Sequence, residues 1–196
     1  MSQDHQQRMA RKKAVIDERI AKATEERGVL ILLRGNGKGK SSSAFGTLAR
    51  ALGHGQRVAV VQFIKGRVQT GEYKLFHDHP RVQWHVMGHG FTWETQDKQQ
   101  DIEAAQQAWA VTEQLLQDEN IDMLVLDEMS YMFKYRYLPI EPVVAALQHR
   151  PKNQTVIITG RTMVEELLAI GDTISTIKDD GHAFRLGVKA QAGIEW

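Results

Sequence analysis

Apolar residues along the chain gather in short continuous runs that alternate with longer segments of helical spacing. The runs predict strands at residues 29–33, 58–64, 82–87, 123–128, 155–160 and 172–177. The intervening segments predict helices at residues 41–55, 97–119, 139–150 and 163–171. Strict alternation of strand and helix predicts an α/β fold, with a mostly parallel six-stranded sheet that carries helices on both faces.

Residues 1–27 follow a different pattern. They are polar and mixed in charge, and their thin apolar stripe consists of Met9, Ile16, Ile20 and Ala23 at helical spacing. Such a helix is stable only when it docks on another surface. We therefore expect an N-terminal helical arm at residues 1–27, followed by one α/β domain at residues 28–196.

Composition narrows the class of protein. The chain has 196 residues with a net charge of +1, so we expect neither a nucleic-acid nor a membrane partner. It has no cysteine, which excludes a disulfide framework, a thiolate metal site and a cysteine nucleophile. The N-terminus lacks the apolar core of a signal peptide, and no apolar run approaches the ~20 residues of a membrane helix. These features favour a cytoplasmic location.

A glycine-rich loop follows the first predicted strand. In parallel sheets, ligands bind at the carboxyl ends of the strands. The segment GNGKGKSS at residues 35–42 ends as a phosphate-binding loop does, although Arg34 stands where the first glycine of the usual pattern belongs. Gly35, Gly37 and Gly39 allow backbone N–H groups of the loop to converge on an anion, and the next helix, which begins near Lys40, points its positive end at that anion. A turn without any ligand is the alternative, but the order of strand, loop and helix argues against it.

Charged side chains in this loop suit a nucleotide. Lys40 can reach phosphate oxygens, Lys38 adds a second positive charge, and the Ser41 hydroxyl can bind Mg²⁺. Asp127 and Glu128 follow another buried strand, where phosphate-loop enzymes place a carboxylate that holds Mg²⁺ directly or through water. A solvated acidic pair is the better interpretation of these two residues alone, but not beside the phosphate loop.

Two further loops lie at the same predicted edge of the sheet. Phe91 and Trp93 flank Thr92 after the third strand, where they could project into a cleft, although core packing is the commoner use of two aromatic residues. Arg161 follows the fifth strand, where an arginine can pair with phosphate or ribose. A surface salt bridge is an equally good interpretation of Arg161.

Six segments in this order resemble the ATP:corrinoid adenosyltransferase family. They are GNGKGKSS, VVQFIKG, GFTWETQ, VLDEMSYM, QTVIITGR and GVKAQAGIEW, and the resemblance covers essentially the whole chain. The non-glycine residue at position 34 is typical of that family. Its members usually carry two threonines where Ser41 and Ser42 stand, and serine keeps the hydroxyl.

The resemblance implies a phosphate-loop architecture of the RecA type and a function in adenosylcobalamin biosynthesis. In that family, cobalt(I) of a reduced corrinoid (cobalamin) attacks the 5′ carbon of ATP, and triphosphate leaves. Family members bind ATP in a reversed orientation in the loop, and the resemblance implies Mg²⁺ or Mn²⁺ as the metal. The family forms homodimers in which the N-terminal helix caps the partner's corrinoid site, and a flavodoxin-type protein supplies electrons. The implied ATP-binding residues are Gly35, Asn36, Gly37, Lys38, Gly39, Lys40, Ser41, Ser42 and Arg161. The implied metal ligands are Ser41, Asp127 and Glu128, and the implied catalytic residues are Lys40, Phe91 and Trp93.

A RecA-like ATPase that acts on nucleic acid or on a protein partner is the alternative. The sheet, the loop and the acidic pair would serve it equally well. The near-neutral charge and the lack of a second domain argue against it. A nucleic-acid-binding arm is a weaker interpretation, because five acidic residues dilute the arm's positive charge.

Overall fold

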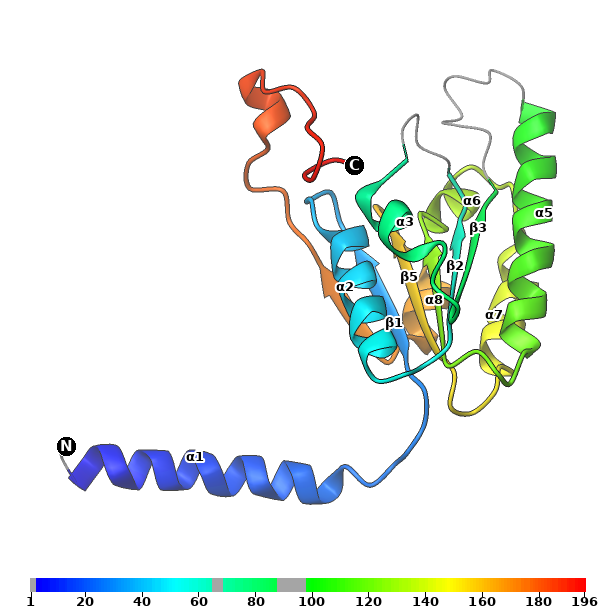
Figure 1. Cartoon of the computed structure of the whole chain (residues 1–196). Coiled ribbons are helices and arrows are strands. Elements are labelled where there is room, and N and C mark those ends of the chain that lie inside the picture. The colour runs from blue at the N-terminus through cyan, green and yellow to red at the C-terminus, as the bar shows by residue number, and fades with distance from the viewer. Residues whose placement is uncertain (1–2, 65–68, 88–97) are drawn as a thin grey trace.

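The protein is built around a six-stranded parallel sheet (Figure 1). The computed structural model describes residues 3–64, 69–87 and 98–196. The strand order is β3-β2-β4-β5-β1-β6, and every pair is parallel. The strands are β1 (Leu30–Arg34), β2 (Val58–Gln62), β3 (Val82–Val86), β4 (Met123–Asp127), β5 (Thr155–Gly160) and β6 (Thr173–Thr176). This arrangement confirms the predicted α/β fold class.

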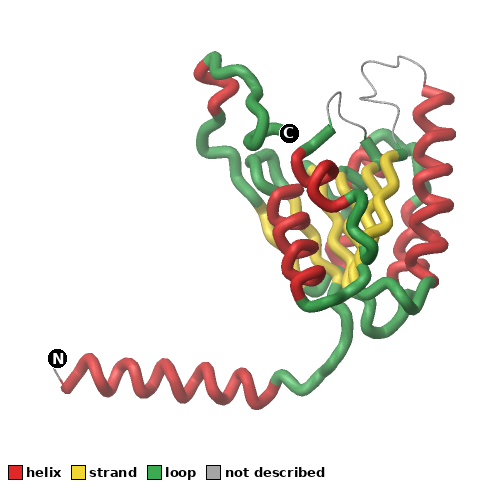
Figure 2. Tube along the Cα trace, viewed as in Figure 1, coloured by secondary structure: helices red, strands yellow, loops and turns green. Residues whose placement is uncertain are grey.

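Helices cover both faces of the sheet (Figure 2). α2 (Lys40–Gly53) and α3 (Gly71–Phe76) pack on one face. The opposite face carries α5 (Lys98–Gln117), α6 (Ser130–Lys134), α7 (Ile140–Gln148) and α8 (Glu165–Ile170). Because every strand pair is parallel, the carboxyl ends of the strands lie at one edge of the sheet, where the residues that follow β1, β4 and β5 come together.

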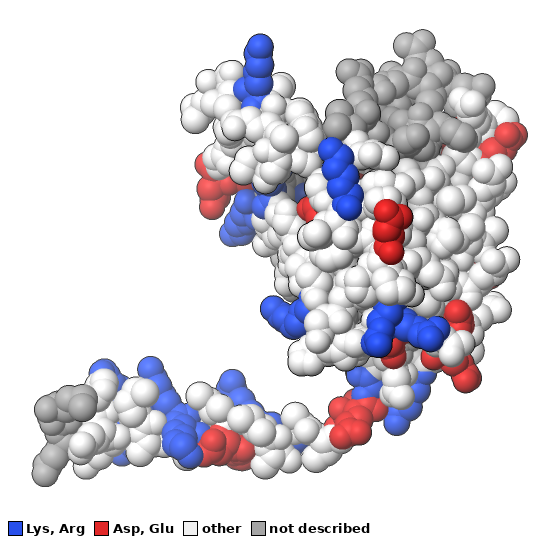
Figure 3. All heavy atoms as spheres, in the orientation of Figure 1, with Lys and Arg blue, Asp and Glu red and all other residues white. Residues whose placement is uncertain are grey.

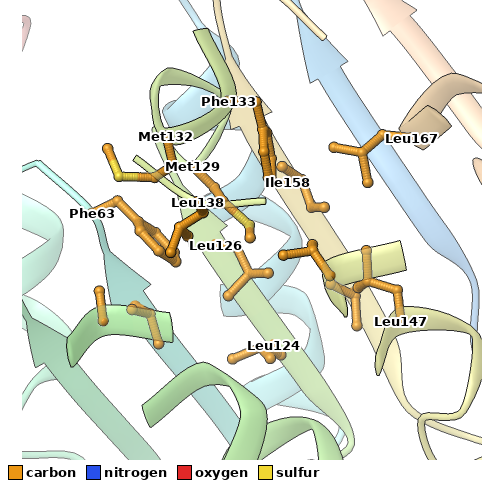
Figure 4. Close-up of a cluster of buried hydrophobic side chains, with 14 of the residues drawn as sticks. Phe63, Leu124, Leu126, Met129, Met132, Phe133, Leu138, Leu147, Ile158 and Leu167 are labelled. Atoms are coloured by element: carbon orange, nitrogen blue, oxygen red, sulfur yellow. The ribbon is translucent and has the colours of Figure 1, made fainter. Parts of the chain in front are cut away.

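Alternation along each strand divides the core into two clusters. In β1, Leu32 faces the larger cluster under α5, α7 and α8, whereas Leu33 faces the smaller cluster under α2. Figure 4 shows the larger cluster, in which Leu126 of β4 and Ile158 of β5 lie near Leu147 of α7. Both strand faces are therefore buried, which explains why the sequence shows continuous apolar runs. The edge strand β6 differs, because all four of its residues are exposed.

The six predicted strands and the four helices predicted between residues 41 and 171 are present with bounds that differ by two residues or fewer. The predicted N-terminal helix is present as well, but it ends at Lys22, five residues before the end of the predicted arm. Two short helices, α3 and α6, and the 3-10 turn η1 (Ala183–Leu186) were not predicted. The three are too short for helical periodicity to be visible. A local signal existed for α3, since the Thr70 hydroxyl accepts a hydrogen bond from the Tyr73 N–H at 3.2 Å as an N-cap.

α1 (Gln3–Lys22) extends away from the domain (Figure 1). Its described side chains, from His5 to Lys22, are all exposed. Positive and negative side chains both line it (Figure 3), and Lys13–Asp17 and Lys22–Glu18 form ion pairs one turn apart. After the helix, Arg27 forms a two-pronged ion pair with Asp172 just before β6, which fastens the chain to the sheet. None of the described helices has the length and apolar character needed to cross a membrane.

Candidate functional site

A cleft of about 530 Å³ opens at the carboxyl edge of the sheet. It is lined by the loop between β1 and α2, by the ends of β2 and β4, and by Arg161 after β5. Every predicted site residue within the described chain lines this cleft, except Gly35. Phe91 and Trp93 lie outside the described residues. The fold thus brings together residues that are more than a hundred positions apart in the sequence.

Gly35 and Gly37 of the loop form backbone hydrogen bonds within the protein. The Gly35 N–H donates to the Arg161 carbonyl at 3.1 Å, and the Gly37 N–H donates to the Ile177 carbonyl at 2.9 Å. These two N–H groups are therefore occupied by backbone carbonyls, so the N–H groups that could meet an anion come from the residues that follow. A Cβ atom at Gly37 would lie 2.2 Å from the Lys178 carbonyl oxygen, so glycine is needed where the chain after β6 packs on the loop.

The start of α2 has backbone groups that could bind an anion. Gly39 is the N-cap residue with φ 118°, a conformation that favours glycine. The first N–H groups of the helix, from Lys40 to Ser42, have no partner within the helix and carry its positive end. These groups could bind phosphate at the helix start, where the sequence predicts an anion site.

A hydrogen bond to the loop holds the Lys40 side chain in place. Its side chain is buried, and its ammonium group donates to the Gly37 carbonyl at 2.9 Å. Burial lowers the pKa of Lys40, and the nearby charges of Arg161 and Lys38 lower it further, against the opposing effect of Glu128 and Asp127. A phosphate beside Lys40 would relieve this repulsion among three cations.

Asp127 is the centre of a hydrogen-bond network. Its Oδ1 accepts hydrogen bonds from the Ser41 and Thr159 hydroxyls, each at 2.8 Å. Its Oδ2 accepts from Gln62 Nε2 at 3.2 Å. Thr159 also accepts the Glu128 N–H at 2.9 Å, so it holds both the carboxylate and the turn that follows it. The network links the start of α2 to the ends of β2, β4 and β5.

Sequence reasoning missed Gln62 and Thr159. A weak signal was present, because each is a polar residue within an otherwise apolar run that ends at the predicted ligand edge. Reasoning from the sequence assigned the ligand contacts to the loops that follow these strands and overlooked the last strand residues themselves.

Glu128 lies in an unusual environment. Its backbone has φ 57°, and its buried Oε2 atom has no hydrogen-bond partner among the described residues. Burial, together with the negative charge of Asp127, raises the pKa of Glu128 to about 7. An unpaired buried carboxylate oxygen is costly unless a cation joins it.

The donor atoms here suit a hard divalent cation. Ser41, Asp127 and Glu128 offer only oxygen, which Mg²⁺ and Mn²⁺ prefer. Across residues 3–64, 69–87 and 98–196, no three acidic or histidine side chains form a metal cluster. That pattern fits Mg²⁺ in phosphate-loop proteins, where one or two carboxylates share the ion with the phosphates of the ligand.

A loop of this kind at a helix start, with a lysine beside it and a carboxylate on a neighbouring strand, defines the class of P-loop nucleotide-binding proteins. Several P-loop functions share this geometry, so the class alone leaves the reaction open.

Comparison with known proteins supplies the family. Residues 26–196 match the family described as ATP:corrinoid adenosyltransferase BtuR/CobO/CobP, and residues 1–20 match the description Cob(I)alamin adenosyltransferase N terminal. The chain belongs to the ATP:corrinoid adenosyltransferase family and is an enzyme with ATP and a corrinoid as substrates.

Relatives align along nearly their full length. A Pseudomonas aeruginosa protein named corrinoid adenosyltransferase is 53% identical over 195 residues, covering 99% of this chain and 96% of that protein. The protein of that name in Escherichia coli K12 is 49% identical, and corrinoid adenosyltransferase CobA of Salmonella typhimurium is 50% identical. Each of these two alignments covers 98% of this chain and 97% of the relative.

Proposed function

We propose that this enzyme transfers the 5′-deoxyadenosyl group of ATP to cobalt(I) of a reduced corrinoid. The cobalt electron pair forms the bond to the 5′ carbon, the bond from that carbon to the 5′ oxygen breaks, and triphosphate leaves with the electron pair. The observation that carries the proposal is the polyphosphate cradle formed by Lys40, Ser41 and the start of α2, in a chain that belongs to the adenosyltransferase family.

In this reaction the cradle stabilises a leaving group. Charge grows on the triphosphate as the bond to carbon breaks, and Lys40 with the N–H groups of α2 lies where it can neutralise that charge. Lys38 and Arg161 line the same cleft and add to the positive field. Cobalt(I) is a strong nucleophile, so the protein needs no general base and contributes alignment instead.

Ser41, Asp127 and Glu128 would hold Mg²⁺ in this proposal. The ion would supply positive charge to the triphosphate oxygens. Thr159 and Gln62 would keep the Asp127 carboxylate oriented through the hydrogen bonds described above. The raised pKa of Glu128 implies that metal binding displaces a proton from its carboxyl near neutral pH.

The test is the identity of the phosphate product. The enzyme is incubated with ATP, MgCl₂ and chemically reduced cobalamin, and we expect tripolyphosphate and adenosylcobalamin in equal amounts. ADP and orthophosphate released in equal amounts without any corrinoid would instead establish the RecA-like ATPase.

We also propose a role for Phe91 and Trp93, which the family resemblance marks as catalytic residues. Two apolar rings under the corrin would displace its lower ligand and make cobalt(II) easier to reduce. The Phe91→Ala/Trp93→Ala variant should lose activity when a flavodoxin must reduce cobalt(II), but retain most of it when cobalt(I) is supplied chemically. If a four-coordinate cobalt(II) spectrum persists in this variant with ATP present, the rings have only a packing role.

The exposed helix α1 supports a homodimer in which it caps the partner's corrinoid site. Its stripe includes Met9, Ile16 and Ile20, which are 50–66% exposed and therefore available to a second surface. This assignment keeps residues 1–27 as an arm and residues 28–196 as the catalytic domain.

A further inference from the structure

The C-terminal segment, residues 177–196, runs back over the phosphate loop. Ile177 extends the pairing of β6 with β1, because its N–H donates to the Arg34 carbonyl at 2.8 Å and its carbonyl accepts the Gly37 N–H. Beyond η1 the chain returns and ends beside the loop that precedes α2 (Figure 1). His182 and residues 193–196 form one wall of the 530 Å³ cleft.

An ion pair joins this segment to the loop. Lys38 Nζ lies 2.7 Å from Glu195 Oε2, and both side chains line the cleft. The two residues are 157 positions apart in the sequence. The Glu195 carboxylate therefore pairs with Lys38 of the loop, as a phosphate oxygen of a bound ligand would.

The ion pair between Lys38 and Glu195 is partly exposed to water, unlike a buried structural ion pair. The Lys38 side chain is 40% exposed and the Glu195 side chain 29% exposed, so water competes for both charges and the pair is weak. A triphosphate with its several charges is a stronger partner for Lys38. A carboxylate that stayed in place would repel that ligand across the cleft.

We propose that Glu195 competes with triphosphate for Lys38, holding the lysine in the empty enzyme and giving it up when the polyphosphate binds. The proposal rests on the proposed function, in that the loop is taken to bind the triphosphate group. The same exchange, run in reverse, helps the triphosphate product to leave, because Glu195 takes back Lys38.

The test measures tripolyphosphate binding by titration calorimetry at constant MgCl₂, with wild type, Glu195→Gln, Lys38→Gln and the double variant. Glu195→Gln should tighten binding about fivefold at low salt, the upper end for an exposed ion pair. The gain should shrink in high salt. In the Lys38→Gln background, Glu195→Gln should tighten binding much less, because only the repulsion across the cleft remains. Glu113→Gln, which removes an exposed carboxylate from α5, is the matched control and should bind like wild type.

The outcomes separate this proposal from the proposed function. Unchanged or weaker binding by Glu195→Gln would show that Glu195 only clamps the segment, and the competition would be rejected. A gain that is equally large without Lys38 would assign the whole effect to the general field of the cleft and would also reject the competition. If the wild-type enzyme bound neither tripolyphosphate nor ATP, the phosphate site itself would be rejected, and the proposed function with it.

Discussion

Glu128→Gln tests the electrostatics of the site directly. The wild-type carboxyl is buried beside Asp127, its Oε2 atom lacks a partner, and its pKa is raised to about 7. Glutamine has nearly the same shape and cannot ionise. The substitution therefore removes the buried charge and leaves the turn at φ 57° unchanged.

The magnitude follows from proton linkage. The folded chain holds the proton of Glu128 more tightly than the unfolded chain does, so wild-type stability falls as pH rises from about 4.5 to about 7 and then levels off. The change from 4.5 to about 7 corresponds to about 3 kcal/mol. The buried amide of the variant also lacks a partner, which offsets part of this gain. We expect the variant to be more stable than wild type by about 2 kcal/mol at pH 8, and the difference to disappear near pH 5.

Urea unfolding at pH 5 and pH 8, with EDTA and without nucleotide, measures this difference. Glu113→Gln removes an exposed carboxylate on α5 and should leave the free energy of unfolding almost unchanged at both pH values. MgCl₂ and ATP should stabilise wild type more than Glu128→Gln, because the variant lacks a metal ligand. A Glu128→Gln protein that is less stable than wild type at pH 8, or equally different at both pH values, would refute the buried-charge argument.

Three further predictions concern the loop, its packing and the arm. Lys40→Ala should slow adenosylation about a hundredfold in a steady-state assay, which corresponds to about 3 kcal/mol. Lys152→Ala, which removes an exposed lysine at the opposite edge of the sheet, should leave the rate unchanged. Near-normal turnover by Lys40→Ala would exclude the loop as the phosphate site. Gly37→Ala should destabilise the fold by about 1–3 kcal/mol in urea unfolding, since its Cβ meets the Lys178 carbonyl. The control Gly46→Ala in α2 has open space around the new Cβ and should stabilise the fold by about 1 kcal/mol. Equal effects of the two substitutions would contradict the close packing at Gly37. Deletion of residues 1–24 should leave a folded domain that binds ATP with unchanged affinity but binds corrinoid more weakly, and full corrinoid affinity in the truncated protein would count against the capping role of α1.

Much of the fold follows from local sequence pattern. Continuous apolar runs such as residues 155–160 predict strands because both faces of the sheet are covered, and the structure confirms them. The chemistry of the loop is visible for the same reason, since Gly39, Lys40 and Ser41 act through their own backbone and side chains at the start of one helix. Residue type and order are enough when the interacting groups lie a few positions apart.

The tertiary structure decided how distant residues share the cleft. Thr159 and Gln62 reach Asp127 only because β5 and β2 flank β4, a strand order that the alternation of elements leaves open. The glycines at 35 and 37 serve the passage of residues 177–178 over the loop, which nothing near them in the sequence indicates. The pairing of Lys38 with Glu195 joins positions that are 157 apart. Local periodicity fixes which face of an element is buried, but only the packing of the complete sheet determines which side chains meet at its edge.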